Sequence, residues 1–141
     1  MCGDAASVKG DFDLVYIDTP YIGEKGKCVN YAEFYHFLNG IAQYEKWPEL
    51  IDYDSPHKRL KRVDCPWCDK KRIADAFENI FIHYSKSALA VSYRSDGIPS
   101  VEALSDMLRK FYRHVVVNES WEIKYALSKS KSKEVLLVAY N

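Results

Sequence analysis

The residues with the clearest chemical potential are Asp18, Thr19, Pro20 and Tyr21, which directly follow the apolar run LVYI at residues 14–17. The Asp18 carboxylate can accept a hydrogen bond from an amine, and the main-chain carbonyl of Thr19 can accept a second. Proline fixes its own φ and restricts the residue before it, so Pro20 aims that carbonyl. Tyr21 supplies an aromatic face on which a flat ring can stack. This pattern predicts a site that grips an exocyclic amino group on a planar base.

The segment Cys65-Pro-Trp-Cys68 allows three interpretations. A zinc site needs four ligands, so Cys65 and Cys68 are weak candidates that Cys2, Cys28 or His57 would have to complete. A redox pair normally follows an apolar strand, whereas the residues before Cys65 read HKRLKRVD. We therefore expect no metal and a local turn with two reduced thiols. Four unevenly spaced cysteines without an export signal indicate a reducing, cytoplasmic setting.

A basic stretch between residues 57 and 72 is a candidate for contact with phosphates, and a solvated loop is the alternative. Its cations, interrupted by Asp64 and Asp69, are Lys58, Arg59, Lys61, Arg62, Lys70, Lys71 and Arg72. Because the formal net charge is zero, no global field attracts a polyanion, and nucleic-acid contact requires such a local patch. Lys58, Arg59, Lys61 and Arg62 are the candidate substrate-binding residues of this stretch.

The elements that must position these residues fit into one domain, because 141 residues with 48% hydrophobic content can bury a sizeable core. No apolar run approaches the roughly 20 residues of a membrane span, and the first ten residues do not form a signal peptide. The continuous apolar character of residues 13–18 predicts a strand buried on both faces in a parallel sheet. Helical spacing follows at 31–46, ended by Trp47-Pro48, and again at 70–84, on either side of a polar, irregular stretch at 48–71.

The second half of the chain reads as a strand at 87–93, a turn at 94–99, and a helix at 101–112 with Ser100 as its N-cap. Strands follow at 114–118, 121–127 and 134–140, of which the first two could form one bent strand. This order predicts an α/β sheet of mixed direction, with a closing antiparallel hairpin. If strands 13–18 and 87–93 are parallel, Tyr93 ends at the same edge as Asp18. Tyr93 then either lines the pocket for a base or is a half-buried packing residue.

The tetrapeptide DTPY at the end of the first strand resembles the (D/N)-P-P-(Y/F/W) motif of amino-group DNA methyltransferases, with Thr19 in place of the usual proline. Its context adds the segments DLVYIDTPY, YAEFYHFLNGIAQY, DCPWCDKK and SYRSDGIPSVEAL. Over residues 11–127 the sequence is similar to the Dam-like DNA adenine-N6 methyltransferases. Because position 19 acts through its main-chain carbonyl, threonine need not abolish function there.

The resemblance implies a Rossmann-like sheet, double-stranded DNA as partner, and Asp18, Thr19, Pro20 and Tyr21 as the catalytic motif. In the family, the target adenine is flipped out of the duplex. Asp18 and the Thr19 carbonyl would take the two N6 hydrogen bonds, and the nitrogen lone pair would attack the sulfonium methyl of S-adenosylmethionine. Tyr21 would stack on the base.

One part of the family pattern is missing, namely the Phe-x-Gly-x-Gly-type loop for the cofactor. The six glycines stand at 3, 10, 23, 26, 40 and 97, and only 23 and 26 are close together. Residues 1–141 therefore resemble a single partial domain, the catalytic-motif half without the cofactor half and the target-recognition region. We expect weak or no cofactor binding and an exposed edge at residues 14–18. That edge would pair with an N-terminal half polypeptide or cause self-association.

Two other functions stay open from the residues. The first is a non-catalytic DNA-binding or assembly module, and the second is a thiol–disulfide oxidoreductase that uses Cys65 and Cys68.

Overall fold

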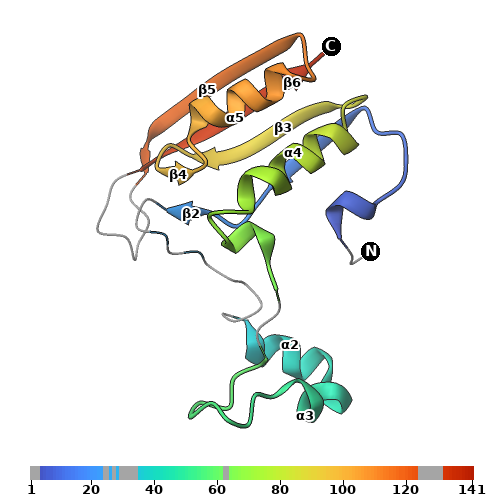
Figure 1. The fold of residues 1–141 in the computed structure, drawn as a ribbon, viewed down its shortest axis with the longest axis vertical. Coiled ribbons are helices and arrows are strands. Elements are labelled where there is room, and N and C mark those ends of the chain that lie inside the picture. The colour runs from blue at the N-terminus through green and yellow to red at the C-terminus, as the bar shows by residue number, and fades with distance from the viewer. Residues whose placement is uncertain (1–3, 24–25, 27, 29–34, 62–63, 124–131) are drawn as a thin grey trace.

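A four-stranded mixed sheet forms the centre of the protein, with the strand order β1-β3-β6-β5 (Figure 1). The computed structural model describes residues 4–23, 26, 28, 35–61, 64–123 and 132–141. β1 (Leu14–Asp18) runs parallel to β3 (Ala88–Arg94). β6 (Ser132–Tyr140) is antiparallel to both β3 and β5 (His114–Ile123). The predicted α/β sheet of mixed direction with a closing hairpin is confirmed, and the Rossmann-like arrangement stays a prediction.

Two helices cover one face of this sheet. α4 (Ile73–His83) leads from the first half of the chain into β3, and α5 (Val101–Arg109) connects β3 to β5 (Figure 1). The apolar residues at helical spacing within the predicted helix 70–84 are all buried. They are Ile73, Phe77, Ile80, Phe81 and Tyr84. The Ser100 hydroxyl accepts a hydrogen bond from the amide of Ala103, as expected of an N-cap.

The opposite face of the sheet is uncovered by any described segment, and we call it the open face. Its side chains include Leu14 and Tyr16, which are 60% and 62% exposed, together with Val116, Leu136 and Tyr140. The prediction that β1 is buried on both faces is therefore wrong. An apolar run indicates a tendency to be buried, but it does not supply the segment that covers it. Among the described residues β1 pairs only with β3, so it is an edge strand, as predicted.

A small two-stranded sheet lies beyond the carboxyl ends of β1 and β3. β2 (Ile22–Gly23) pairs antiparallel with β4 (Gly97–Ile98), where the sequence predicted only a turn at 94–99. The two strands predicted at 114–118 and 121–127 are one strand, β5, with a register shift between Glu119 and Glu122. The bent-strand alternative is therefore correct up to residue 123, and residues 124–131 lie outside the described residues.

Residues 35–61 form a separate small body, which we call the insert lobe, and Figure 1 shows it apart from the sheet. It contains α2 (His36–Ala42), a 3-10 turn at Tyr44–Lys46 and α3 (Trp47–Leu50). The predicted helix at 31–46 is thus shorter, and residues 31–34 lie outside the described residues. Trp47-Pro48 does not end the helical region but opens α3, since proline is well tolerated in the first turn of a helix.

Short 3-10 turns also occur at Ala5–Ser7 and Pro66–Cys68. No helix in the described part of the chain is both long enough and apolar enough to cross a bilayer.

Candidate functional site

Asp18 is the last residue of β1, and its side chain is exposed. Its register partner on the neighbouring parallel strand is Ser92. In parallel sheets the carboxyl ends of the strands meet at one edge, where ligand sites commonly lie. The fold therefore brings Asp18 and Ser92 side by side, although 74 positions separate them in the sequence numbering.

Tyr21 reaches back over this strand end and contacts both residues. Its hydroxyl donates a hydrogen bond to Asp18 Oδ1 over 3.0 Å, and the Ser92 hydroxyl lies 3.5 Å from the same phenol oxygen. Burial raises the pKa of the Tyr21 phenol well above its usual value; the Ser92 hydrogen bond opposes this rise, while the hydrogen bond and negative charge of Asp18 add to it. The phenol is therefore neutral near pH 7 and acts as a donor to Asp18.

The ring of Tyr21 is supported by a second tyrosine. Tyr93 meets it edge-on with ring centroids 5.8 Å apart, and Tyr93 is fully buried. The Tyr93 hydroxyl donates to the Pro99 carbonyl over 2.8 Å. A Cβ on Gly97 would lie 2.6 Å from the Tyr93 ring, so this close approach of β4 requires glycine. Tyr93, predicted either to line the pocket or to pack half-buried, lies behind Tyr21 and holds it in place.

Thr19 and Pro20 complete the motif. Thr19 is buried, and its Oγ1 atom has no hydrogen-bond partner among the described residues. A buried hydroxyl without a partner lowers the stability of the fold, so the Thr19 side chain does not contribute a structural hydrogen bond. This fits a position that acts through its main-chain carbonyl.

A shallow hollow of about 230 Å³ opens next to this site. Ser92 lies at its side nearest to Asp18, and Asn118, Glu134 and Leu136 line it further along the open face. This volume is below the roughly 300–1,000 Å³ of complete ligand pockets. Residues 18–21 do not line this hollow, and Asp18 is exposed rather than packed inside the protein.

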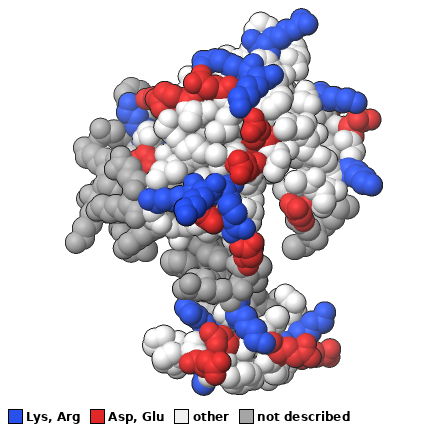
Figure 2. Space-filling model, in the orientation of Figure 1, with Lys and Arg blue, Asp and Glu red and all other residues white. Residues whose placement is uncertain are grey.

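The candidate phosphate contacts lie in the insert lobe, and no described contact joins them to residues 18–21. Arg59 faces Asp52 at 3.8 Å, and Lys58 donates to the Tyr53 carbonyl above the Tyr53 ring. Lys61 is exposed, whereas Arg62 lies outside the described residues. Figure 2 shows acidic and basic side chains intermixed over the lobe, not a continuous basic face.

The remaining part of the basic stretch is partly neutralised by its own acids. The Arg72 guanidinium binds Asp64 and Asp69, and these contacts hold the pKa of both carboxyl groups below the usual range. For Asp64 the hydrogen bond from Arg72 is the main cause, and for Asp69 it is the hydrogen bond from the Lys71 amide. These exposed pairs favour the solvated-loop interpretation for residues 64–72.

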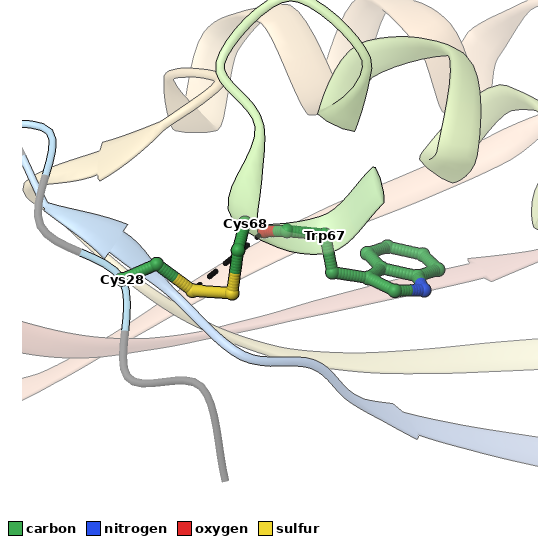
Figure 3. The surroundings of a disulfide bond; sticks show 3 residues. All are labelled: Cys28, Trp67 and Cys68. Carbon is green, nitrogen blue, oxygen red and sulfur yellow. Dashed lines mark hydrogen bonds between the residues drawn. A yellow bond between two sulfur atoms is a disulfide. The ribbon is translucent and has the colours of Figure 1, made fainter. Parts of the chain in front are cut away.

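The cysteines correct the expectation of reduced thiols. Cys28 and Cys68 form a disulfide, with Cα atoms 5.3 Å apart (Figure 3). Cys65 is free. The main chain of Cys28 forms an isolated antiparallel bridge with Ile22 in β2, while its disulfide partner Cys68 lies 40 positions further along the chain. The sequence signal, a pair of cysteines three positions apart, pointed to the wrong partner. Cys68 is thereby lost as a metal ligand, and the alternative of a Cys65–Cys68 redox pair does not match this pairing.

Among the described residues, no group of three or more His, Cys, Asp or Glu side chains is arranged to hold a metal ion. Sequence reasoning also missed Ser92 and Pro99 as parts of the site. The register of two parallel strands is the signal that could have found Ser92, because Ser92 lies opposite Asp18, which ends the first strand.

Comparison with curated proteins gives four relatives, and the following three span the range of sequence identity. Modification methylase LlaI of Lactococcus lactis subsp. lactis is 31% identical over 99 residues, which is 70% of this chain and 15% of the relative. Type II methyltransferase M.FokI of Planomicrobium okeanokoites is 29% identical over 124 residues, 86% of this chain and 18% of the relative. Type II methyltransferase M.NlaIII of Neisseria lactamica is 24% identical over 110 residues, 77% of this chain and 30% of the relative.

The chain therefore spans less than a third of the length of these relatives. No protein-family model and no solved structure matches it.

Proposed function

We propose that this chain, which is similar to a modification methylase and to type II methyltransferases over most of its length, is part of a DNA methyltransferase and carries the wall of the active site that binds the amino group to be methylated. The group is N6 of an adenine flipped out of double-stranded DNA. The observation that carries the proposal is Asp18, exposed at a strand end with Oδ1 already held by Tyr21.

The two N–H bonds of the amine are donated to Asp18 and to the carbonyl of Thr19. An amine whose hydrogens are held in this way keeps its lone pair on nitrogen instead of sharing it with the ring, so the nitrogen becomes a better nucleophile. No side chain of this chain has to form a covalent intermediate. Tyr21, backed by Tyr93, provides the surface on which the base stacks, a contact worth about 1–3 kcal/mol at comparable sites.

S-adenosylmethionine is the methyl donor implied by the relationship. The described residues do not fit this cofactor, because none of them forms a closely spaced glycine loop after a strand. A Cβ on Gly23 would meet no atom within 4 Å, so this glycine does not belong to a tight loop around a ligand. We therefore assign donor binding to polypeptide outside these 141 residues and derive no step of it from this chain.

The same polypeptide is the partner that fits the open face and the free edge of β1. Leu14 and Tyr16 are more than half exposed there, and they lie on the strand of the parallel β1–β3 pair, a pairing that normally occurs in sheets covered on both faces. A further strand beside β1, with helices over the open face, would complete a Rossmann-like sheet. Self-association through β1 is the alternative occupant. Light scattering of the chain alone tests this expectation. A monomer at high concentration contradicts association through the edge of β1 and through the apolar open face.

DNA contacts by Lys58, Arg59, Lys61 and Arg62 remain part of the proposal. Acidic side chains lie among these cations in the insert lobe, and Arg59 faces Asp52. The support for DNA contacts is therefore weaker than the support that the geometry of Asp18 gives to the amine site.

The test is transfer of labelled methyl groups from S-adenosylmethionine to DNA, with this chain alone and with the missing half of the enzyme supplied separately. Asp18→Ala should abolish transfer, while Asp54→Ala, an exposed aspartate of the insert lobe, should leave it unchanged. Transfer that survives in Asp18→Ala contradicts the assigned role. Digestion of the product to nucleosides identifies the methylated base. A methylated cytosine would contradict the assignment of adenine as the target, but not the assignment of methyl transfer. A chain that binds the partner half but yields no transfer is the non-catalytic assembly module.

A further inference from the structure

We propose that Ser92 and the hydroxyl of Tyr21 are positioning residues, which fix the Asp18 carboxylate in the orientation that receives the amine. The inference rests on the proposed function, since it states how the amine acceptor is held. Neither the motif nor the sequence pattern assigns a role to Ser92.

The geometry forms a short chain of hydroxyls that ends on Asp18. The phenol of Tyr21 donates its one hydrogen to Asp18 Oδ1 at 3.0 Å. The Ser92 hydroxyl lies 3.5 Å from the same phenol oxygen, and because the phenol hydrogen is already used, Ser92 is the donor of that pair. The hydrogen bond with Ser92 lowers the pKa of Tyr21, and the hydrogen bond with Asp18 raises it. These opposite effects agree with Ser92 as the donor to the phenol oxygen and Asp18 as the acceptor of the phenol hydrogen. Hydrogen bonds in such a chain polarise and strengthen one another.

The consequence lies in the second oxygen of the carboxylate. In the described part of the chain no hydrogen bond reaches Asp18 Oδ2. With Oδ1 held by Tyr21, rotation of the carboxylate is restricted, and Oδ2 is the acceptor left for the substrate. An acceptor that is already oriented does not lose side-chain freedom when the amine arrives, so more of the binding interaction is available to the reaction.

The frame around these hydroxyls is rigid enough for this role. Ser92 is fixed opposite Asp18 by the parallel ladder of β1 and β3. Tyr21 is held between that ladder and the buried Tyr93, which is itself anchored on the Pro99 carbonyl. The Tyr21 hydroxyl therefore has a function separate from the stacking face of its ring.

Three variants separate these functions. Tyr21→Phe keeps the ring and removes the hydroxyl, Ser92→Ala removes the first donor, and Ser92→Thr keeps it. With the complete enzyme assembled, Tyr21→Phe and Ser92→Ala should each lower kcat about tenfold, with KM for DNA unchanged, because a hydrogen bond to a charged group is lost. Ser92→Thr should restore wild-type kcat. The control is Tyr44→Phe, whose exposed ring in the insert lobe contacts Trp47 and whose change should have no effect.

A second readout does not depend on activity. In the full 141-residue chain, the ¹³Cγ resonance of Asp18 reports the hydrogen bond to its carboxylate, and it should shift in Tyr21→Phe and Ser92→Ala but not in Tyr44→Phe. A resonance that is unmoved in both hydroxyl variants overturns the inference, even in an active enzyme. An unchanged kcat in both variants overturns it as well. If the wild-type enzyme transfers no methyl group, the proposed function fails by itself, and the resonance alone then supports or overturns the orientation of Asp18.

Discussion

The strand-end site and the insert lobe differ in the sequence separation of the contacts that form them. At the site, the decisive contacts join distant parts of the chain: Tyr21 meets Ser92, and Asp18 is paired with Ser92 across two strands. In the lobe, the described contacts are local, such as Arg59 with Asp52 and Ser55 with Asp52. The proposed amine site therefore depends on the pairing of the sheet, while the lobe depends on its own short-range contacts.

The two regions also differ in what they bury. Phe77 lies in the core against Trp67, Phe81 and Tyr93, with ring centroids 5.1 to 5.7 Å apart. In the lobe, Phe37 contacts the Trp47 ring at 5.9 Å but is 57% exposed. The free energy of folding is therefore concentrated in the sheet and its helices.

The largest expected effect tests this contrast directly. Phe77→Ala should lower the free energy of unfolding by about 3–5 kcal/mol, because it leaves a cavity in a close-packed core. Phe37→Ala should lower it by less than about 1 kcal/mol. Urea unfolding of both variants gives the comparison, and equal losses would mean that the lobe and the core are one cooperative unit.

The disulfide is the next test, because it lies where the two regions meet. Cys28→Ser should lower the free energy of unfolding by about 2–4 kcal/mol, since a cross-link over a sequence separation of 40 restricts the unfolded chain. Cys65→Ser is the matched control and should change nothing, because Cys65 is free. Hydrogen exchange should speed up in residues 35–61 more than in β3. Faster exchange in β3 instead would place the cross-link in the core of the sheet.

The glycines that face each other in the β2–β4 pair give a finer test of the site. Gly97→Ala should cost about 1–3 kcal/mol, since its Cβ meets the Tyr93 ring, and should reduce methyl transfer because Tyr93 supports Tyr21. Gly23→Ala, its register partner, has nothing within 4 Å of the new Cβ and should stay within about 0.5 kcal/mol of wild type. Thermal unfolding compares the pair, and an equally stable Gly97→Ala would show that Tyr93 is free to move.

The smallest effect concerns the departure from the family motif. Thr19→Val should raise the free energy of unfolding by about 1 kcal/mol, because it replaces a buried hydroxyl without a partner by a methyl group. Methyl transfer should persist, since the carbonyl at position 19 is retained. A loss of transfer with unchanged stability would assign the hydroxyl, rather than the carbonyl, to the reaction.

Local signals in the sequence predicted the elements that depend on neighbouring residues. The apolar run before Asp18 gave β1, the spacing of Ile73, Phe77 and Ile80 gave α4, and Ser100 marked the start of α5. Each of these signals acts within one or two turns or one strand, so it is visible without the rest of the fold.

Several of the errors come from pairing between residues distant in the sequence. The β2–β4 pair and the contact of Ser92 with Tyr21 depend on strand register, and the Cys28–Cys68 bond joins residues 40 positions apart. The acidic partners of Arg59 and Arg72 likewise depended on how the chain turns, so counting cations overstated the basic stretch. DTPY was visible from the sequence, but what holds its acid in place was not.

The position of the Cys28–Cys68 bond has a consequence for how this architecture can vary. The excursion that contains the insert lobe leaves and re-enters the main body at two residues whose Cα atoms are 5.3 Å apart. A tight turn of a few residues spans that gap. We therefore expect that a change in the length of this excursion leaves β1, α4 and the acid at the strand end in their places.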